Sequence, residues 1–209
     1  YVPDDNFELE LINLGLDSGP LNDTVPTAAI DTVLELILVN KGIYDLTGIE
    51  DFASLNKLNI ESNQISSLDL SYNTNLNWLN CQYNILQGNL DLSNNTLLTY
   101  LKAQGNYITS LSLTSDSLIT YFNLQNNQVY TLDLSNFTSV TYCNLKNNQL
   151  TSIDASNCTS IRYLFVNNNN LQSLNFKNGN NTTVTSPNGG FNSTGNYNLE
   201  CIEVDDPVY

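Results

Sequence analysis

Four aspartates at regular spacing are the residues of this sequence whose type and spacing best suit cation binding: Asp69, Asp91, Asp133 and Asp154. Carboxylates on adjacent turns of a repeating chain would offer the oxygen ligands that calcium prefers. The glycine-containing, ligand-dense spacing of calcium-binding loops is absent, and each Asp precedes a Ser by two residues, which is typical of a local turn. We therefore predict that this column is structural and that the protein holds no metal ion and no cofactor.

Catalysis has few candidate residues in this chain. Histidine is absent, so proton transfer would rest on carboxylates, Lys, Tyr or Cys. The cysteines, which show no C-x-x-C spacing, are Cys81, Cys143, Cys158 and Cys201. Without a histidine partner we do not expect an activated thiol, and we expect no disulfide framework. The sequence predicts a protein that is not an enzyme.

The charge balance excludes several classes of partner. Six Lys and Arg stand against 21 Asp and Glu, and the net charge of −15 would repel nucleic acid and an anionic bilayer surface. No apolar run approaches the roughly 20 residues of a membrane-spanning helix. The chain begins at Tyr1 without Met or an apolar leader, so we expect a removed signal peptide, with any anchor outside the sequence. We expect a monomer.

An internal repeat dominates the sequence. Asparagines recur at intervals of 21, 22, 21, 21 and 21 residues, at Asn63, Asn84, Asn106, Asn127, Asn148 and Asn169. Around each Asn, at frame position 9, apolar residues stand at positions 1, 4, 6 and 11, which is the pattern LxxLxLxxNxL. The units begin at Leu55, Leu76, Leu98, Ile119, Val140 and Ile161, with a weaker unit at Val33. Residues 33–181 are thus predicted to form seven repeats.

This spacing predicts one short strand in each unit. Alternation of apolar and polar residues buries frame positions 4 and 6 and turns positions 3, 5 and 7 outward. One unit cannot bury its apolar side chains alone, so the units must stack in parallel. The Asn at position 9 would satisfy backbone groups where the chain leaves the strand. A second alternating stretch, such as residues 131–135, predicts a second extended side without room for a full helix.

These units resemble those of the leucine-rich repeat family in its short bacterial form. The stretches 2–7 and 43–50 are similar to the N-terminal cap of secreted and cell-surface members, including internalin-like proteins. The resemblance implies a leucine-rich repeat solenoid of parallel β coils, with few or no helices in the repeats and a small helical N-terminal cap. It also implies a secreted or surface-displayed bacterial protein that binds partners, usually proteins, on the concave strand face.

The ends of such a stack must be covered, because open apolar edges aggregate. Residues 1–32 are predicted to form the N-terminal cap. Asp4 or Asp5 can begin a helix there by accepting hydrogen bonds from its first amides. That helix would bury Phe7, Leu11 and Leu14.

A polar run over residues 182–198 interrupts the frame and predicts an inserted loop, with Phe191 and Tyr197 as its contact residues. The frame returns at Leu199, Ile202 and Val204. We therefore predict that residues 199–209 form a closing strand and cap, with Cys201 at frame position 3. The whole chain would be a single domain.

The outward columns predict a ligand-binding face. Position 3 carries Trp78, Tyr100, Tyr121, Tyr142 and Tyr163. Position 5 carries Asn80, Lys102, Asn123, Asn144 and Phe165. Position 7 carries Gln82, Gln104 and Gln125. Rings flanked by neutral amides bury area at low entropic cost and offer hydrogen bonds.

Two ligand classes fit this face. A protein or extended peptide would use the rings as anchors, whereas a neutral glycan would stack its sugars on Trp and Tyr. Repeat duplication can also produce such a column, since stacked Tyr stabilises adjacent strands without a ligand, and a structural spacer is the third reading. We predict a non-catalytic recognition or adhesion module for an extracellular protein, with neutral-glycan binding or a spacer role as alternatives.

Overall fold

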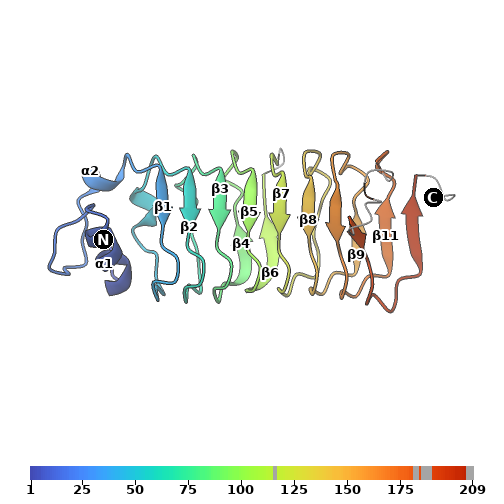
Figure 1. Cartoon of the computed structure of the whole chain (residues 1–209), viewed down its shortest axis with the longest axis horizontal. Coiled ribbons are helices and arrows are strands. Elements are labelled where there is room, and N and C mark those ends of the chain that lie inside the picture. Colours follow the sequence, from blue (N-terminus) through green and yellow to red (C-terminus); the bar gives the residue numbers. More distant parts are fainter. Residues whose placement is uncertain (115–116, 181–183, 185–189, 206–209) are drawn as a thin grey trace.

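The computed structural model describes residues 1–114, 117–180, 184 and 190–205 and shows one row of stacked coils (Figure 1). The helices are α1 (Asp5–Asn13), α2 (Thr27–Ile30) and the 3-10 helix η1 (Ile49–Asp51). The strands are β1 (Glu35–Ile37), β2 (Lys57–Asn59), β3 (Trp78–Asn80), β4 (Gln87–Asp91), β5 (Tyr100–Lys102), β6 (Tyr107–Ser112), β7 (Tyr121–Asn123), β8 (Tyr142–Asn144), β9 (Ser152–Asp154), β10 (Tyr163–Phe165), β11 (Ser173–Phe176), β12 (Phe191–Asn192) and β13 (Cys201–Val204). The predicted solenoid of parallel coils with a helical N-terminal cap is confirmed.

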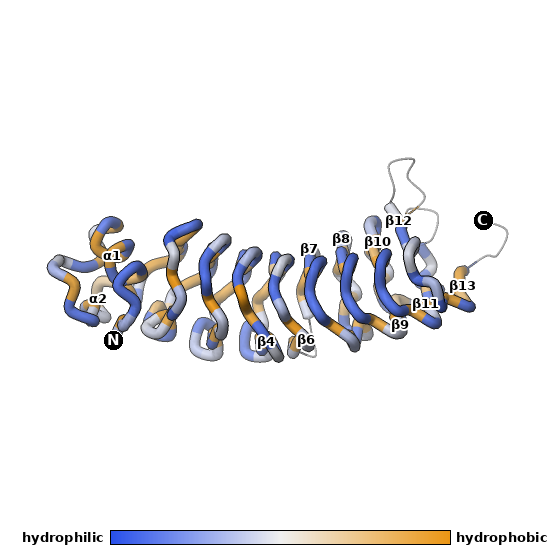
Figure 2. The backbone as a smooth tube through the Cα atoms, turned by 90° about the horizontal axis from the view of Figure 1, so that it is seen from below, coloured by the Kyte–Doolittle hydropathy of each residue, from blue (hydrophilic) through white to orange (hydrophobic). Residues whose placement is uncertain are grey.

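One strand from each coil contributes to an eight-stranded parallel sheet, in the order β1-β2-β3-β5-β7-β8-β10-β12. The second extended sides form two smaller sheets, β4-β6 and β13-β11-β9, which lie on the other side of the coils (Figure 2). Both extended sides were expected, and among the described residues the second side pairs only within these two small sheets. The β4–β6 pairing shifts register between Gly88 and Asn89, where Thr109 is the extra residue on β6.

The interior of the coils is a continuous apolar core. At frame position 4 the register partners are Leu58, Leu79, Leu101, Phe122, Cys143 and Leu164, all without exposed surface. Their outward neighbours at positions 3 and 5 lie on the opposite face of each strand, because side chains alternate along a strand. Phe122 also packs edge-on against Phe137 from the other side of the coil, at 5.1 Å between ring centroids.

A buried asparagine joins each coil to the one before it. Asn127 donates its side-chain amide to the carbonyls of Ala103 (2.9 Å) and Leu124 (3.0 Å), and its Oδ1 accepts the Ile108 N–H at 3.0 Å. The same arrangement recurs at Asn63, Asn84, Asn106, Asn148, Asn169 and Asn196. These bonds give partners to backbone groups that the turn would otherwise bury unpaired.

The residue before this asparagine takes a left-handed backbone conformation in every coil. Its φ lies between 55° and 74° at Ser62, Tyr83, Gly105, Asn126, Asn147, Asn168 and Gly195, and is 54° at Asn40, which precedes Lys41 at the equivalent position of the first coil. Asn and Gly tolerate this region best, which explains why they occupy most of these positions. Tyr83 is the exception among them, since a bulky side chain is disfavoured there.

The N-terminal cap is tied to the first coil by a buried carboxylate. Asp4 Oδ1 accepts the N–H groups of Asn6 and Phe7, both at 2.9 Å, and so begins helix α1. Its Oδ2 accepts the N–H groups of Tyr44 (2.8 Å) and Asp45 (3.0 Å). One side chain therefore joins the helix to a turn 40 residues further along the chain.

Leu14 does not lie in the cap's core, which corrects the sequence-based expectation. Phe7 and Leu11 are fully buried, but Leu14 is 52% exposed. The helix ends at Asn13, and Leu14 already belongs to the turn that Gly15 completes at a φ of 74°. The helical period that aligned Leu14 with Leu11 therefore stops one residue too early to bury it.

The C-terminal end also differs from the prediction. Phe191 and Asn192 do not lie in an inserted loop, because they form β12 and pair with β10 as the eighth strand of the long sheet. Phe191 faces the interior and stacks on Phe176, at 5.5 Å and 15°. Residues 181–183 and 185–189, the first part of the predicted loop, lie outside the described residues, as do residues 206–209.

The predicted closing strand lies on the other side of the coil from the one expected. β13 pairs with β11, so Cys201 stands beside Ser173 in the three-stranded sheet and does not continue frame position 3. Both extended sides of a coil alternate with the same period of two, so the spacing of Leu199, Ile202 and Val204 fits either side. Asn196, inside the predicted loop, marks the true eighth coil.

Among the described residues, no helix is long and apolar enough to cross a membrane.

Candidate functional site

Five aromatic side chains lie in register along the outward side of the eight-stranded sheet, which we call the sheet face. They form the aromatic row, Trp78, Tyr100, Tyr121, Tyr142 and Tyr163. From Trp78 to Tyr142 the centroids of adjacent rings are 5.0, 4.4 and 4.5 Å apart, with interplanar angles of 8°, 13° and 1°. Adjacent strands are about 4.8 Å apart, so parallel register alone brings the rings face to face.

Stacking limits what a ligand can reach on this row. Tyr100 and Tyr121 each have a ring on both sides, so their ring faces are covered and a ligand can reach only their edges. The stack loosens at Tyr163, which lies 6.0 Å from Tyr142, is tilted by 46° and is 41% exposed. Phe165 packs against both of these Tyr rings, at 5.8 Å and 6.5 Å. Ring faces are thus more accessible at this end than in the middle.

Two lysines lie over the row. The Lys57 ammonium is 5.5 Å from the centroid of Trp78 and 3.1 Å from the Glu35 carboxylate. The Lys102 ammonium lies 5.8 Å from Tyr100 and 5.9 Å from Tyr121. Cation–π attraction therefore holds both ammonium groups close to the sheet face.

The environment of the row changes the acidity of its central phenol. Burial, together with the repulsion that adjacent phenolates of Tyr142 and Tyr100 would exert, raises the pKa of Tyr121 from 10.0 to about 12. A group whose pKa is higher in the folded state stabilises the fold below its unfolded pKa and loses that contribution as the pH rises.

This shift predicts an alkaline loss of stability. The contribution of Tyr121 is fully present below about pH 10 and is lost as the pH rises through about 12. We expect Tyr121→Phe to lose less stability than the parent protein across this interval, measured by urea unfolding just above and just below it. Tyr130→Phe, which changes an exposed phenol outside the row, serves as control. An equal loss in all three proteins would contradict the assignment.

Most amides of the predicted ligand face are already hydrogen-bonded within the protein. Asn80 is only 3% exposed and donates to Glu61 Oε2 at 2.8 Å. Asn144 donates to Gln125 Oε1 at 2.8 Å. The other buried amides of this set are Asn123, Gln82 and Gln104, and the last two bond to each other. The expected row of free amides beside the rings is therefore largely internal structure, and the rings and lysines remain the accessible groups.

Three exposed apolar residues that follow the strands of the long sheet in the chain were missed by sequence reasoning. Tyr83, Ile85 and Tyr107 are all exposed, on two adjacent coils. The ring of Tyr83 lies over Gly105, where a Cβ atom would come within 2.6 Å of it. The available signal was a Tyr at a position where other coils carry Asn, Gly or Ser.

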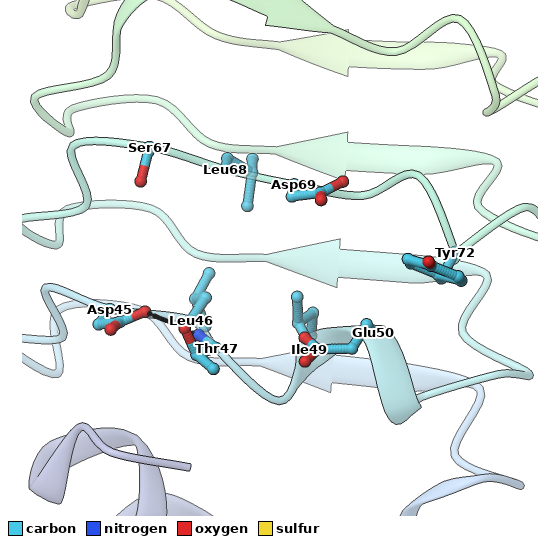
Figure 3. A pocket seen from close by; sticks show the side chains of 9 residues that line it. All are labelled: Asp45, Leu46, Thr47, Ile49, Glu50, Ser67, Leu68, Asp69 and Tyr72. Carbon is cyan, nitrogen blue, oxygen red and sulfur yellow. Dashed lines mark hydrogen bonds between the residues drawn. The ribbon is translucent and has the colours of Figure 1, made fainter. Parts of the chain in front are cut away.

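The aspartate column lies on the opposite side of the coils. In each case Oδ1 accepts the N–H of the Ser two residues later, as Asp69 does from Ser71 at 2.9 Å, and these hydrogen bonds lower the Asp pKa. A shallow cleft of about 270 Å³ beside Asp69 also carries the carboxylates of Asp45 and Glu50 (Figure 3). In the described part of the chain, no group of His, Cys, Asp or Glu has the arrangement of a metal site.

The cysteines are separate thiols among the described residues. Burial raises the pKa of Cys81 and of Cys158 to about 12, and raises that of Cys143 well above its usual value. Cys201 is exposed on β13. The three buried thiols are core side chains that remain protonated at neutral pH.

Part of this chain is similar in sequence to a known protein, and its fold is similar to solved structures. No family model matches the sequence. A stretch of 74 residues is 38% identical to Internalin J of Listeria monocytogenes, which is 35% of this chain and 8% of that protein. The structure is similar to the functional domain of InlJ from the same species, described as including a cysteine ladder, with a TM-score of 0.65 and 24% identity over 98% of this chain and 60% of that one.

A leucine-rich repeat protein of Leptospira interrogans superposes with a TM-score of 0.63 and 23% identity, over 71% of this chain and 40% of that one. The repeat frame, the asparagine ladder and these neighbours define the class of the fold, a leucine-rich repeat solenoid. More particularly, the chain is similar to internalins, in sequence over 35% of its length and in fold over 98% of it. It spans less than two thirds of the proteins that it matches first.

Proposed function

We propose that this chain is a non-catalytic recognition or adhesion module that binds an extracellular protein segment on the sheet face. The observation that carries the proposal is the aromatic row, a continuous line of partly exposed rings on an open sheet. Such a patch on a folded protein is typical of a binding surface. Aromatic residues also dominate the energetics of protein interfaces. The internalin-like fold supports a secreted or cell-surface location, since internalins are bacterial secreted or surface proteins.

Ring stacking favours a protein ligand over a neutral glycan. A sugar packs its C–H groups against the face of an aromatic ring, but the faces of Tyr100 and Tyr121 are covered by their neighbours. Ring edges and phenol hydroxyls suit the peptide groups and apolar side chains of a protein. The exposed ring of Tyr163 supports the glycan alternative at one end of the row only.

Removal of two rings tests this proposal. We expect Trp78→Ala combined with Tyr121→Ala to weaken binding of a protein ligand by about 1,000-fold, because hot-spot aromatics contribute about 2 kcal/mol or more each. The measurement is binding to arrays of extracellular proteins and of glycans. Circular dichroism and thermal unfolding would show that the variant remains folded.

The matched control is Tyr44→Ala combined with Tyr130→Ala, which removes two exposed rings outside the row. A protein ligand that binds the row variant as tightly as the parent chain would exclude the sheet face. A glycan ligand lost in the row variant would replace the protein assignment. Binding to neither array would favour the spacer role.

A further inference from the structure

We propose that the partner segment is acidic, and that its carboxylates pair with Lys102 and Lys146 on the sheet face. This inference rests on the proposed function and specifies the chemistry of the partner. Its starting point is that a chain with a net charge of −15 holds only six cationic side chains. Three of these form ion pairs among the described residues: Lys41, Lys57 and Lys177.

The other three cations are Lys102, Lys146 and Arg162, for which the described part of the chain supplies no acidic partner. Lys102 occupies frame position 5 and Lys146 occupies position 7, so both project from the outward side of the eight-stranded sheet. Arg162 is exposed at the start of β10, directly before Tyr163. Two of the three cations without an acidic partner, Lys102 and Lys146, thus lie on the sheet face of an acidic protein.

Acidic side chains are absent from the described part of the sheet face that carries the aromatic row. From Trp78 to Asn167, frame positions 3, 5 and 7 carry no Asp or Glu. The nearest carboxylates on the sheet face, Glu35 and Glu61, belong to the first two coils and are bonded to Lys57 and Asn80. The aspartate column lies on the side of the coils that carries the two small sheets, opposite the long sheet (Figure 2).

The two sides of the stack therefore differ in charge. An acidic segment is attracted to the rings of coils three to seven. It is repelled by the aspartate side and by the N-terminal cap and first coil, since residues 1–51 hold 11 of the 21 carboxylates. Lys102 is already held over two rings, so less side-chain freedom is lost when a carboxylate binds to it. Lys102 and Lys146 are two coils apart, about 10 Å along the stack, or about three residues of an extended peptide.

The test uses two synthetic peptides, one with a run of about six glutamates, which spans the roughly 20 Å of the row, and one with glutamines in their place. Binding is followed by the fluorescence of Trp78, the single Trp of the chain. We expect the glutamate peptide to bind, more weakly as salt rises, and the glutamine peptide to bind at least about tenfold less tightly. Lys102→Gln combined with Lys146→Gln should remove most of this difference, because each exposed pair contributes up to about 1 kcal/mol.

The matched control is Lys41→Gln combined with Lys177→Gln, which changes the net charge equally away from the sheet face. Equal binding of the two peptides, no binding of the glutamate peptide, or the same weakening in the control would overturn the proposal. So would a sulfated oligosaccharide that binds through Lys102 and Lys146 when the glutamate peptide does not. A protein ligand that loses binding to the Trp78→Ala, Tyr121→Ala variant but binds the Lys102→Gln, Lys146→Gln variant as tightly as the parent chain would support the recognition function and overturn the acidic partner.

Discussion

Replacement of Asn127 by alanine is expected to lower the free energy of unfolding by about 4 kcal/mol. The substitution leaves the carbonyls of Ala103 and Leu124 and the amide of Ile108 without their partner inside the coil. A buried polar group without a hydrogen bond costs about 1–3 kcal/mol. Asn127 lies at the middle of the stack, where water reaches these groups only if the coils separate. The measurement is urea unfolding followed by circular dichroism.

The control for this experiment is the adjacent residue. Asn126 is left-handed, with a φ of 56°, and its side chain is on the surface, so Asn126→Gly preserves the backbone and is expected to change stability by less than about 1 kcal/mol. If Asn127→Ala were as mild as Asn126→Gly, the ladder would be a by-product of duplication and the stack would be held by its apolar core alone.

The second large effect is expected at Asp4. In Asp4→Asn one of the two carboxylate oxygens becomes an NH₂ group, which cannot accept from the two backbone N–H groups that it faces. We expect a loss of about 3 kcal/mol, concentrated in the N-terminal cap, because two buried donors lose their acceptor. Hydrogen exchange should therefore accelerate at the amides of Tyr44 and Asp45 while the central coils stay protected.

Asp5→Asn is the matched control, because Asp5 is exposed in the first turn of the same helix. Its loss of charge weakens only the interaction with the helix dipole, about 0.3–1 kcal/mol. Uniform acceleration of exchange along the whole stack in Asp4→Asn would show that the cap and the coils unfold as one unit.

The repeat frame was readable from the sequence because its physical causes act on neighbouring coils. Leucines at positions 4 and 6 and Asn at position 9 each need one local partner in the adjacent coil, so their spacing predicts the architecture. The aromatic row was predicted in the same way, since register carries Tyr100 onto Tyr121 once the strands are parallel.

Other features depend on contacts that no spacing contains. Period-two alternation suits both extended sides of a coil, so the sequence predicted β13 on the side opposite to the one it occupies. The ladder role of Asn196 was missed because this residue lies within a polar run that lacks the apolar frame. The amides at positions 5 and 7 were expected to be free. Whether Asn80 bonds to a ligand or to Glu61 depends on side-chain reach across two coils, which composition does not determine.

The stacked rings of Trp78, Tyr100, Tyr121 and Tyr142 repeat along the sheet face at nearly the spacing of adjacent strands. Because every coil contacts only its two neighbours, removal of one whole coil would bring equivalent residues together and leave the ladder and the left-handed turn intact. Under the proposed function, gain or loss of whole coils would therefore change the length of the bound segment in steps of about 4.8 Å. The number of coils would then set the length of the bound segment, while substitutions within a coil would change its chemistry independently.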